Sequence, residues 1–196
     1  MHDDDHYVTA RDMAKISKAA LENETFRYVA CKPNYYIAPT NKDKHGKELW
    51  NHHKMVKRTM FNYDGVEGGK TGYTTKAGGT LVTFAKRGDQ ELIAVDLCAH
   101  GYELYEDTIK MLNYGFNNYK TIAPFKTMNT VLKDDTYGFL KTGNELSPYK
   151  IPLKHLNDVT VMLEKKQSAS KLTYKCKDNK YIISYDGKQI GSVKLH

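Results

Sequence analysis

The sequence predicts an α+β fold, in which an antiparallel sheet with helices is followed by a small all-β domain. Two observations carry this prediction. Before Pro124, segments with the helical period of apolar residues flank β-type runs bounded by glycines, whereas beyond Pro124 the apolar residues alternate as in short strands. We therefore expect two domains, 1–122 and 123–196, that meet near residues 120–125.

The first expected element is a helix over residues 8–22. Thr9 and Asp12 stand three residues apart, as in a capping box, where the hydroxyl caps the helix and the carboxylate reaches back to the cap amide. The apolar residues that follow at helical spacing are Met13, Ile16, Ala20 and Leu21. From there to about residue 64 the chain is polar and interrupted by prolines, so we expect loops, short strands and one helical piece around 51–61.

A glycine-bounded hairpin forms the centre of the first domain. Two apolar runs, 80–87 and 91–98, are joined by a short turn at 88–90, which is typical of antiparallel strands. The helical spacing of apolar residues then predicts a helix over 103–118 that lies on this sheet. Asp96 falls among the apolar residues of the second run, so we expect either an open face there or a partner for its carboxylate.

Short alternating strands predict the all-β domain. They span 159–163, 172–177 and 181–185, and the last of them leads into an Asp186-Gly187 turn.

The composition and charge of the sequence limit the classes of function that it can have. The net charge of +7 and the pI of about 9.1 favour anionic surroundings, but the lysines are spread along the chain, which favours a solvated basic surface over a nucleic-acid site. The longest apolar stretches are far shorter than the roughly 18 residues that cross a bilayer. Because the amino terminus of the sequence is acidic, we expect no secretory signal in it, and we expect no membrane attachment through an amphipathic anchor after Leu195-His196. The widely spaced Cys31, Cys98 and Cys176 are expected to be free thiols.

The glycine-rich stretch 65–79 carries the chemistry. A phosphate-binding loop would need a glycine six positions before Lys70, where Asp64 stands, and an apolar helix after it, where the sequence is strand-like. The alternative is a strand edge that binds substrate. There Lys70 attracts a carboxylate, Thr71 offers it a hydroxyl, and Gly72 leaves room for a substrate backbone to pair with the strand.

A second Lys-Thr-Gly at 141–143 lies in the β-rich part and is interpreted as an ordinary turn. The first copy differs from it in context. The segments around Lys70 closely resemble the serine-type D-alanyl-D-alanine carboxypeptidases, which are low-molecular-mass penicillin-binding proteins of the peptidase S11 type. The segments that carry this resemblance are 65–82, 92–95 and 105–116, with the helix start 6–14 and Trp50-Asn51 as further landmarks.

The resemblance covers about residues 2–120 and implies part of a transpeptidase/β-lactamase-like domain. It implies a reaction in which the D-Ala-D-Ala end of a peptidoglycan stem peptide, or a β-lactam, acylates a serine, with no cofactor, no metal and no nucleic acid. Lys70 is then both catalytic and substrate-binding, Thr71 and Gly72 bind substrate, and the amide of Tyr73 forms half of an oxyanion hole. For the full-length family it also implies an extracytoplasmic, cell-envelope location.

Of the three family motifs, S-x-x-K, S-x-N and K-T-G, only the last is expected to act here. Ser147 and Ser168 do begin S-x-x-K matches, but both follow Lys70 in strand or turn text, whereas the family's serine opens a helix. We therefore expect the nucleophile to belong before residue 1 and the chain alone to be inactive. Leu104-Tyr105 stands where many members carry an arginine on the carboxylate side of the site.

Two histidine-containing segments receive ordinary interpretations. Residues 2–6 hold metal-friendly side chains but are expected to be a solvated or capping segment, and His52-His53 is expected at the surface.

Two functions stay open: part of a carboxypeptidase, or a non-catalytic relative that binds wall peptides or a partner protein. A class A β-lactamase shares the Lys-Thr-Gly logic but carries no trailing β-domain. Because the family's sheet receives its first strands from the amino-terminal segment, strand 91–98 is expected to have an unpaired edge. We expect another copy of the chain, or a rearranged segment of its own, to cap that edge with Asp96 nearby, and the missing half to associate with this one.

Overall fold

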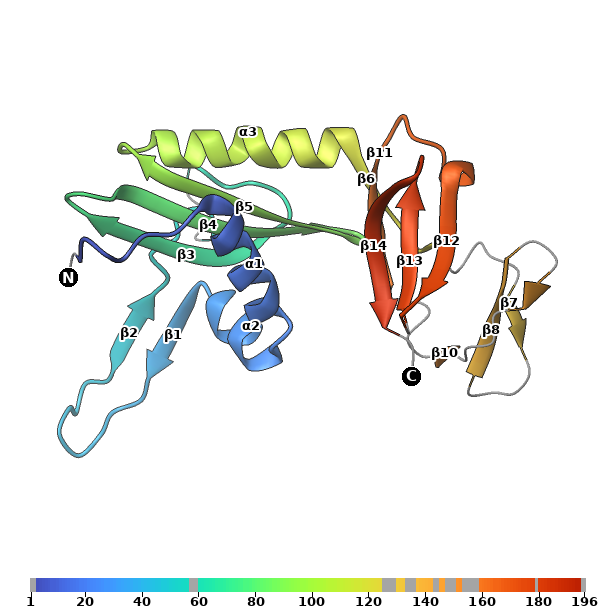
Figure 1. The fold of residues 1–196 in the computed structure, drawn as a ribbon. Helices are drawn as coiled ribbons and strands as arrows, with labels where there is room; N and C mark the ends of the chain where they lie inside the picture. Colours follow the sequence, from blue (N-terminus) through green and yellow to red (C-terminus); the bar gives the residue numbers. More distant parts are fainter. Residues whose placement is uncertain are drawn as a thin grey trace. The chain divides into compact units, whose positions relative to one another are not determined.

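The computed structural model describes residues 3–56, 60–124, 130–132, 137–142, 145–146, 151–152, 159–178 and 180–194 (Figure 1). The chain divides into two compact units, Met1–Phe116 and Asn117–His196. The predicted α+β class is confirmed, because helices and antiparallel sheets build the first unit and the second is dominated by strands.

The helices and strands of the first unit are α1 (Ala10–Leu21), α2 (Glu24–Ala30), β1 (Asn34–Ile37), β2 (Lys47–Trp50), β3 (Val66–Thr74), β4 (Gly78–Arg87), β5 (Gln90–Ala99) and α3 (Glu103–Asn118), whose last two residues extend into the second unit. Strands β3, β4 and β5 form one antiparallel sheet in that order. Strands β1 and β2 form a separate two-stranded hairpin whose side chains are exposed.

The capping box predicted for α1 is confirmed. The Asp12 amide donates to Thr9 Oγ1 at 3.1 Å, and the Thr9 hydroxyl donates to Asp12 Oδ2 at 2.6 Å. This hydrogen bond to the ionised carboxylate lowers the pKa of Asp12.

The helical piece expected around 51–61 does not appear at residues 51–56 and 60–61, and residues 57–59 lie outside the described residues. The helix of this region is α2, which begins after Asn23, whose side chain accepts a hydrogen bond from the Phe26 amide at 2.9 Å. Helix α2 has only 7 residues and buries none of them fully, so its apolar pattern is too short to indicate a helix. Its contact with the sheet includes Phe26 against Phe84, with ring centroids 6.4 Å apart.

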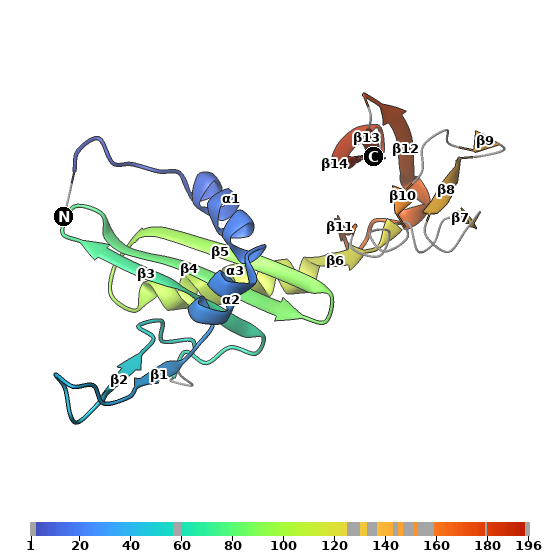
Figure 2. The ribbon, with the colours of Figure 1, turned by 90° about the horizontal axis from the view of Figure 1, so that it is seen from below.

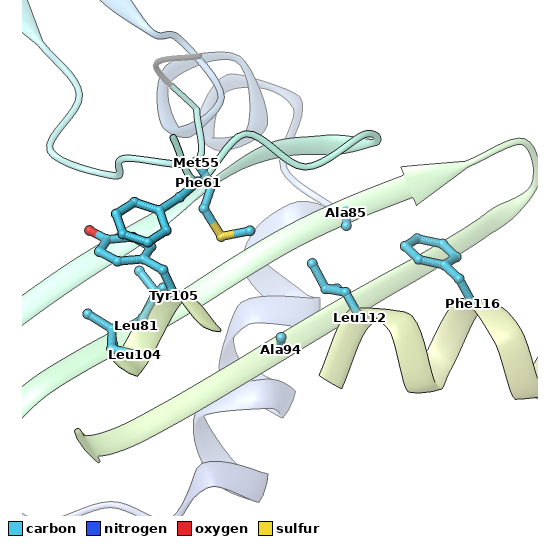
Figure 3. Close-up of a cluster of buried hydrophobic side chains, with 9 residues drawn as sticks. All are labelled: Met55, Phe61, Leu81, Ala85, Ala94, Leu104, Tyr105, Leu112 and Phe116. Carbon is cyan, nitrogen blue, oxygen red and sulfur yellow. The ribbon is translucent and has the colours of Figure 1, made fainter. Parts of the chain in front are cut away.

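Helices cover both faces of the main sheet (Figures 1 and 2). Helix α3 lies on one face, as the helical period predicted, while α1 and α2 lie on the other. The core beneath α3 contains Met55, Phe61, Leu81, Ala85, Ala94, Leu104, Tyr105, Leu112 and Phe116 (Figure 3). This packing holds the middle strand β4 between two helical layers and leaves β3 and β5 as the outer strands.

Asp96 faces the α3 side of β5, because it pairs with the core residue Leu81. Its Oδ2 is buried and has no hydrogen-bond partner among the described residues. Burial, and then the negative charge of Asp107, raise the pKa of Asp96. We expect from the sequence either an open face or a partner for the Asp96 carboxylate. The structure shows neither in full, because the carboxylate is half-buried and another acid, Asp107, lies near it.

The second unit confirms the small all-β part. Strand β6 (Tyr119–Ile122) pairs with β11 (Val161–Glu164), so residues 119–122 belong to this unit. The other described strands are β7 (Thr130–Leu132), β8 (Tyr137–Thr142), β9 (Glu145–Leu146), β10 (Ile151–Pro152), β12 (Leu172–Lys177), β13 (Lys180–Tyr185) and β14 (Lys188–Lys194). A 3₁₀ turn, η2, spans Ala169–Lys171. The core of the unit contains Val161, Leu163, Leu172, Tyr181 and Ile183.

Candidate substrate-binding edge

The predicted site residues lie on an outer strand. Lys70–Tyr73 belong to β3, which among the described residues pairs with β4 alone. Lys70, Gly72 and Tyr73 are exposed and Thr71 is half-buried, and the Tyr73 side chain is 76% exposed. The Lys70 ammonium donates a hydrogen bond to the Thr71 carbonyl oxygen. The edge therefore offers a cation, a hydroxyl and the backbone groups that point away from β4.

Pairing with β4 assigns these residues to the two faces of the sheet. Thr71 pairs with Leu81, a residue of the core beneath α3, and Lys70 pairs with Val82 on the opposite face. Gly72 pairs with Thr80, and a Cβ at residue 72 would lie 2.5 Å from Thr80 Oγ1. A side chain at position 72 would therefore require the Thr80 hydroxyl of β4 to move away.

The start of β3 is tied to α2 and β5 by charge. Arg27 donates to Glu67 of β3 at 2.7 Å and to Glu91 of β5 at 3.0 Å. Burial by itself would raise the pKa of Glu91, but hydrogen bonds and charges from Lys86 and Arg27 lower it overall. One guanidinium thus links the helix to both outer strands.

The interpretation of His52-His53 as surface is wrong for His53. His52 is exposed, whereas the His53 side chain is 0% exposed, with Nε2 2.9 Å from Thr83 Oγ1. Burial disfavours the imidazolium and lowers the pKa of His53 to about 4. No local pattern marks this histidine as buried, because its neighbours come from β3, β4 and α3.

The remaining sequence candidates do not join the edge. Ser168 accepts a hydrogen bond from the Ser170 amide at 3.3 Å and begins the 3₁₀ turn η2 in the second unit, while Ser147 lies outside the described residues. Lys141 and Thr142 end strand β8, so they form strand and not a turn, and Gly143 lies outside the described residues.

Leu104 and Tyr105 are 7% and 4% exposed and belong to the core beneath α3. Position 104 therefore contributes packing to this unit, in place of a charge at the surface.

Among the described residues no group of three or more His, Cys, Asp or Glu side chains is arranged to hold a metal ion, and His2 of the amino-terminal segment lies outside them. In the same part of the chain, every helix is too short or too polar to reach across a bilayer.

The fold of this chain, a three-stranded antiparallel sheet with helices on both faces followed by an all-β unit, is similar to the folds of solved penicillin-binding proteins. Penicillin binding protein 5 from Haemophilus influenzae shares this fold, with a TM-score of 0.63 and 23% identity over 100% of this chain and 57% of that chain. A mutant of the Streptomyces K15 DD-transpeptidase has a TM-score of 0.54 and 29% identity over 59% of this chain and 45% of that one.

The family model of D-alanyl-D-alanine carboxypeptidase, peptidase S11, matches residues 1–101, and the chain belongs to this family. The carboxypeptidase DacF of Bacillus subtilis is 29% identical in an alignment of length 196 that covers 97% of this chain and 46% of DacF. The carboxypeptidase DacC of Escherichia coli K12 is 32% identical over 121 residues, 61% of this chain and 28% of DacC. The chain thus spans half or less of the length of these curated relatives.

Proposed function

We propose that this chain is part of a D-alanyl-D-alanine carboxypeptidase that trims the terminal D-Ala from peptidoglycan stem peptides by serine acylation. The observation that carries the proposal is the placement of Lys70–Tyr73 on the exposed outer strand β3. An extended peptide can pair with such an edge through its backbone, so the strand offers binding before any chemistry takes place.

Each residue of the edge has a role in this proposal. Lys70 attracts the terminal carboxylate of the peptide and, near a serine nucleophile, favours its deprotonated form. Thr71 lies on the other face of the strand from Lys70 and offers its hydroxyl to the substrate from that side, and Gly72 lets the substrate backbone approach. The Tyr73 amide points to a developing oxyanion, which a second amide would complete.

In this proposal the two units of the chain correspond to two different domains of the enzyme. We assign the first unit, Met1–Phe116, to the penicillin-binding domain and the second unit, Asn117–His196, to a carboxy-terminal β-domain, so the boundary lies a few residues before the position 122 expected from the sequence. We place the protein outside the cytoplasm, in the cell envelope. Acyl transfer needs a nucleophile, its activating base and the oxyanion hole together, and such groups lose nearly all their effect when one is removed. The chain alone is therefore expected to bind without acylation, and to regain acylation by pairing with an upstream half that carries S-x-x-K and S-x-N.

A labelled penicillin tests this function. The 196-residue chain alone should form no covalent adduct by mass spectrometry and release no D-alanine from a D-Ala-D-Ala peptide. Mixed with the separately produced upstream half of a family member, it should support both, and Lys70→Ala should abolish the recovery. A stoichiometric adduct on the chain alone would contradict the proposal and direct attention to Ser147 and Ser168.

The alternative function is a non-catalytic relative that binds wall peptides or a partner protein through the same edge. It is favoured by the same exposed strand and differs in one observation. A reading frame that continues upstream into S-x-x-K supports the enzyme, and its absence supports the binding protein.

A further inference from the structure

The residues immediately before Lys70 are in close contact with other parts of the unit on both faces of β3. On the α2 face, a Cβ at Gly68 would lie 2.7 Å from Cys31 Sγ and 2.8 Å from the Ala30 carbonyl oxygen. On the α3 face, a Cβ at Gly69 would lie 2.7 Å from Cδ2 and 2.9 Å from Nε2 of His53. Atoms do not pack that closely, so both positions accept their neighbours only as glycine.

Asn51 joins the two sides of this arrangement. Its side-chain amide donates to the carbonyl oxygens of Ala30 at 3.2 Å and Lys32 at 3.0 Å, at the end of α2. Its Oδ1 accepts from the His53 amide at 3.0 Å, and its own amide donates to the Pro33 carbonyl oxygen at 2.8 Å. One side chain therefore orients both the helix end that touches Gly68 and the loop that carries His53.

The His53 ring is polar, although it lies in the core, where burying an apolar side chain would cost less free energy. It is fully buried, its Nδ1 has no hydrogen-bond partner among the described residues, and the ring of Tyr105 stands edge-on to it with centroids 6.1 Å apart. A buried nitrogen without a partner costs free energy. Compared with a leucine, the imidazole adds a hydrogen bond to Thr83, the residue of β4 that pairs with Gly69.

We propose that Asn51 and His53 are positioning residues for the substrate-binding edge, acting through Gly68-Gly69. Asn51 sets the loop, the loop seats the His53 ring against Gly69 and Thr83, and this contact sets where β3 leaves the core and becomes the outer edge at Lys70. The role of that edge in binding rests on the proposed function, whereas its positioning does not.

Amide hydrogen exchange on the 196-residue chain tests the positioning. His53→Leu and Thr83→Val remove the hydrogen bond, and Asn51→Ala releases the loop. Each should speed exchange of the Lys70–Tyr73 amides that bond to β4 by about tenfold, the scale of one buried hydrogen bond. The matched control His52→Leu alters the exposed neighbour and should change these amides by less than about twofold.

Rescue separates positioning from packing. His53→Gln can still bond to Thr83 and should return the exchange at Lys70–Tyr73 to near the wild-type rate. If Gln protects no better than Leu, or if every protected amide of β4 and β5 speeds up equally, the proposal is wrong. Should His53→Leu fail to fold, Thr83→Val, which replaces one hydroxyl by a methyl group, gives the same test.

Peptide binding distinguishes this proposal from the proposed function. The probe is an N-acetylated D-Ala-D-Ala dipeptide, followed by amide chemical shifts at Lys70–Tyr73. If the wild-type chain does not bind the peptide but His53→Leu still speeds amide exchange at Lys70–Tyr73, only the proposed function is wrong. Unchanged exchange in His53→Leu and Thr83→Val, with normal peptide binding by the wild type, overturns the positioning alone.

Discussion

The two halves of strand β3 are built in opposite ways. In the first half, Gly68 and Gly69 are buried, and Val66 and Glu67 are half-buried. In the second half, Lys70–Thr74, three of five residues are exposed. A strand that binds ligand through its own edge must leave that edge free, so its position has to be set elsewhere. Here the neighbouring half of the same strand provides the anchoring contacts.

Glycine serves both halves, for different reasons. Gly68 and Gly69 admit atoms of α2 and of His53, which come from distant parts of the chain. Gly72 avoids a single hydroxyl of the adjacent strand, on Thr80. We call Val66–Gly69 the anchored half of β3 and Lys70–Thr74 the open half. Substitutions in the anchored half should therefore cost much more stability than substitutions in the open half.

The largest effect is expected for Gly69→Ala. Its Cβ would lie 2.1 Å from the Val82 carbonyl oxygen as well as against His53, and backbone atoms cannot move aside as a flexible side chain can. We expect a loss of about 3 kcal/mol or more in the unfolding free energy of the first unit. Urea unfolding followed by fluorescence of Trp50, the single tryptophan, measures it.

Gly191→Ala is the matched control for Gly69→Ala. A Cβ there would meet Val161 Cγ1 at 3.5 Å, an ordinary contact, in the second unit. It should leave the Trp50 transition unchanged. If Gly69→Ala unfolded at the same urea concentration as the wild type, the prediction that the first half of β3 is fixed by close contacts at Gly69 would be wrong.

The second effect is a pH dependence from His53. Its pKa is about 4 in the folded chain against 6.5 in the unfolded chain, because burial disfavours the charged ring. The unfolded chain therefore binds a proton that the folded chain does not. This stability is fully present above pH 6.5 and is lost as the pH falls towards 4, by about 3 kcal/mol in total.

The comparison with His53→Gln isolates this contribution from the carboxylates that titrate in the same range. Urea unfolding at pH 7 and pH 4.5 should show a smaller loss for His53→Gln than for the wild type. An identical loss in both proteins would show that His53 is not buried as a neutral ring.

The third effect concerns the open half. Gly72→Ala should cost about 1–2 kcal/mol, because its Cβ would lie 2.5 Å from Thr80 Oγ1 and Thr80 must rotate away. Thr80→Ala removes that oxygen, so the double variant should recover most of the loss in a double-mutant cycle. Additive losses would mean that the backbone, and not the Thr80 side chain, limits position 72.

The smallest effect on stability is expected for Lys70→Ala. Lys70 is exposed, so the unfolding free energy should stay within about 0.5 kcal/mol of the wild type. Binding of the D-Ala-D-Ala dipeptide should still fall by about tenfold or more, since the cation of the edge is lost. Isothermal titration calorimetry with both proteins checks this, and an unchanged affinity would show that Lys70 does not contribute to binding of the dipeptide.

The features that could be predicted from the sequence depend on neighbours in the chain. The period of apolar residues predicted α3 at the residues where it forms, and the turn at 88–90 predicted the β4–β5 hairpin. Thr9 and Asp12 predicted the start of α1. The glycines around Lys70 indicated a strand with an open edge, because a short motif specifies the backbone that it needs.

The features that could not be predicted depend on contacts between distant segments. Helix α2 is too short for a readable period and is held against Gly68 of β3. Leu104 looks like a lost charge in the motif comparison, and only the core beneath α3 shows it as a packing residue.

By itself, the sequence determined the fold class, the family resemblance and the Lys70–Tyr73 edge, because these follow from local period and motif. Tertiary structure alone decided that His53 is buried, that Gly68-Gly69 is in contact with other segments on both faces, and that Asn51 joins the two sides. The physical reason is that burial and close packing are properties of segments brought together by folding. A histidine in a polar stretch of sequence carries no local sign of the strands that will enclose it.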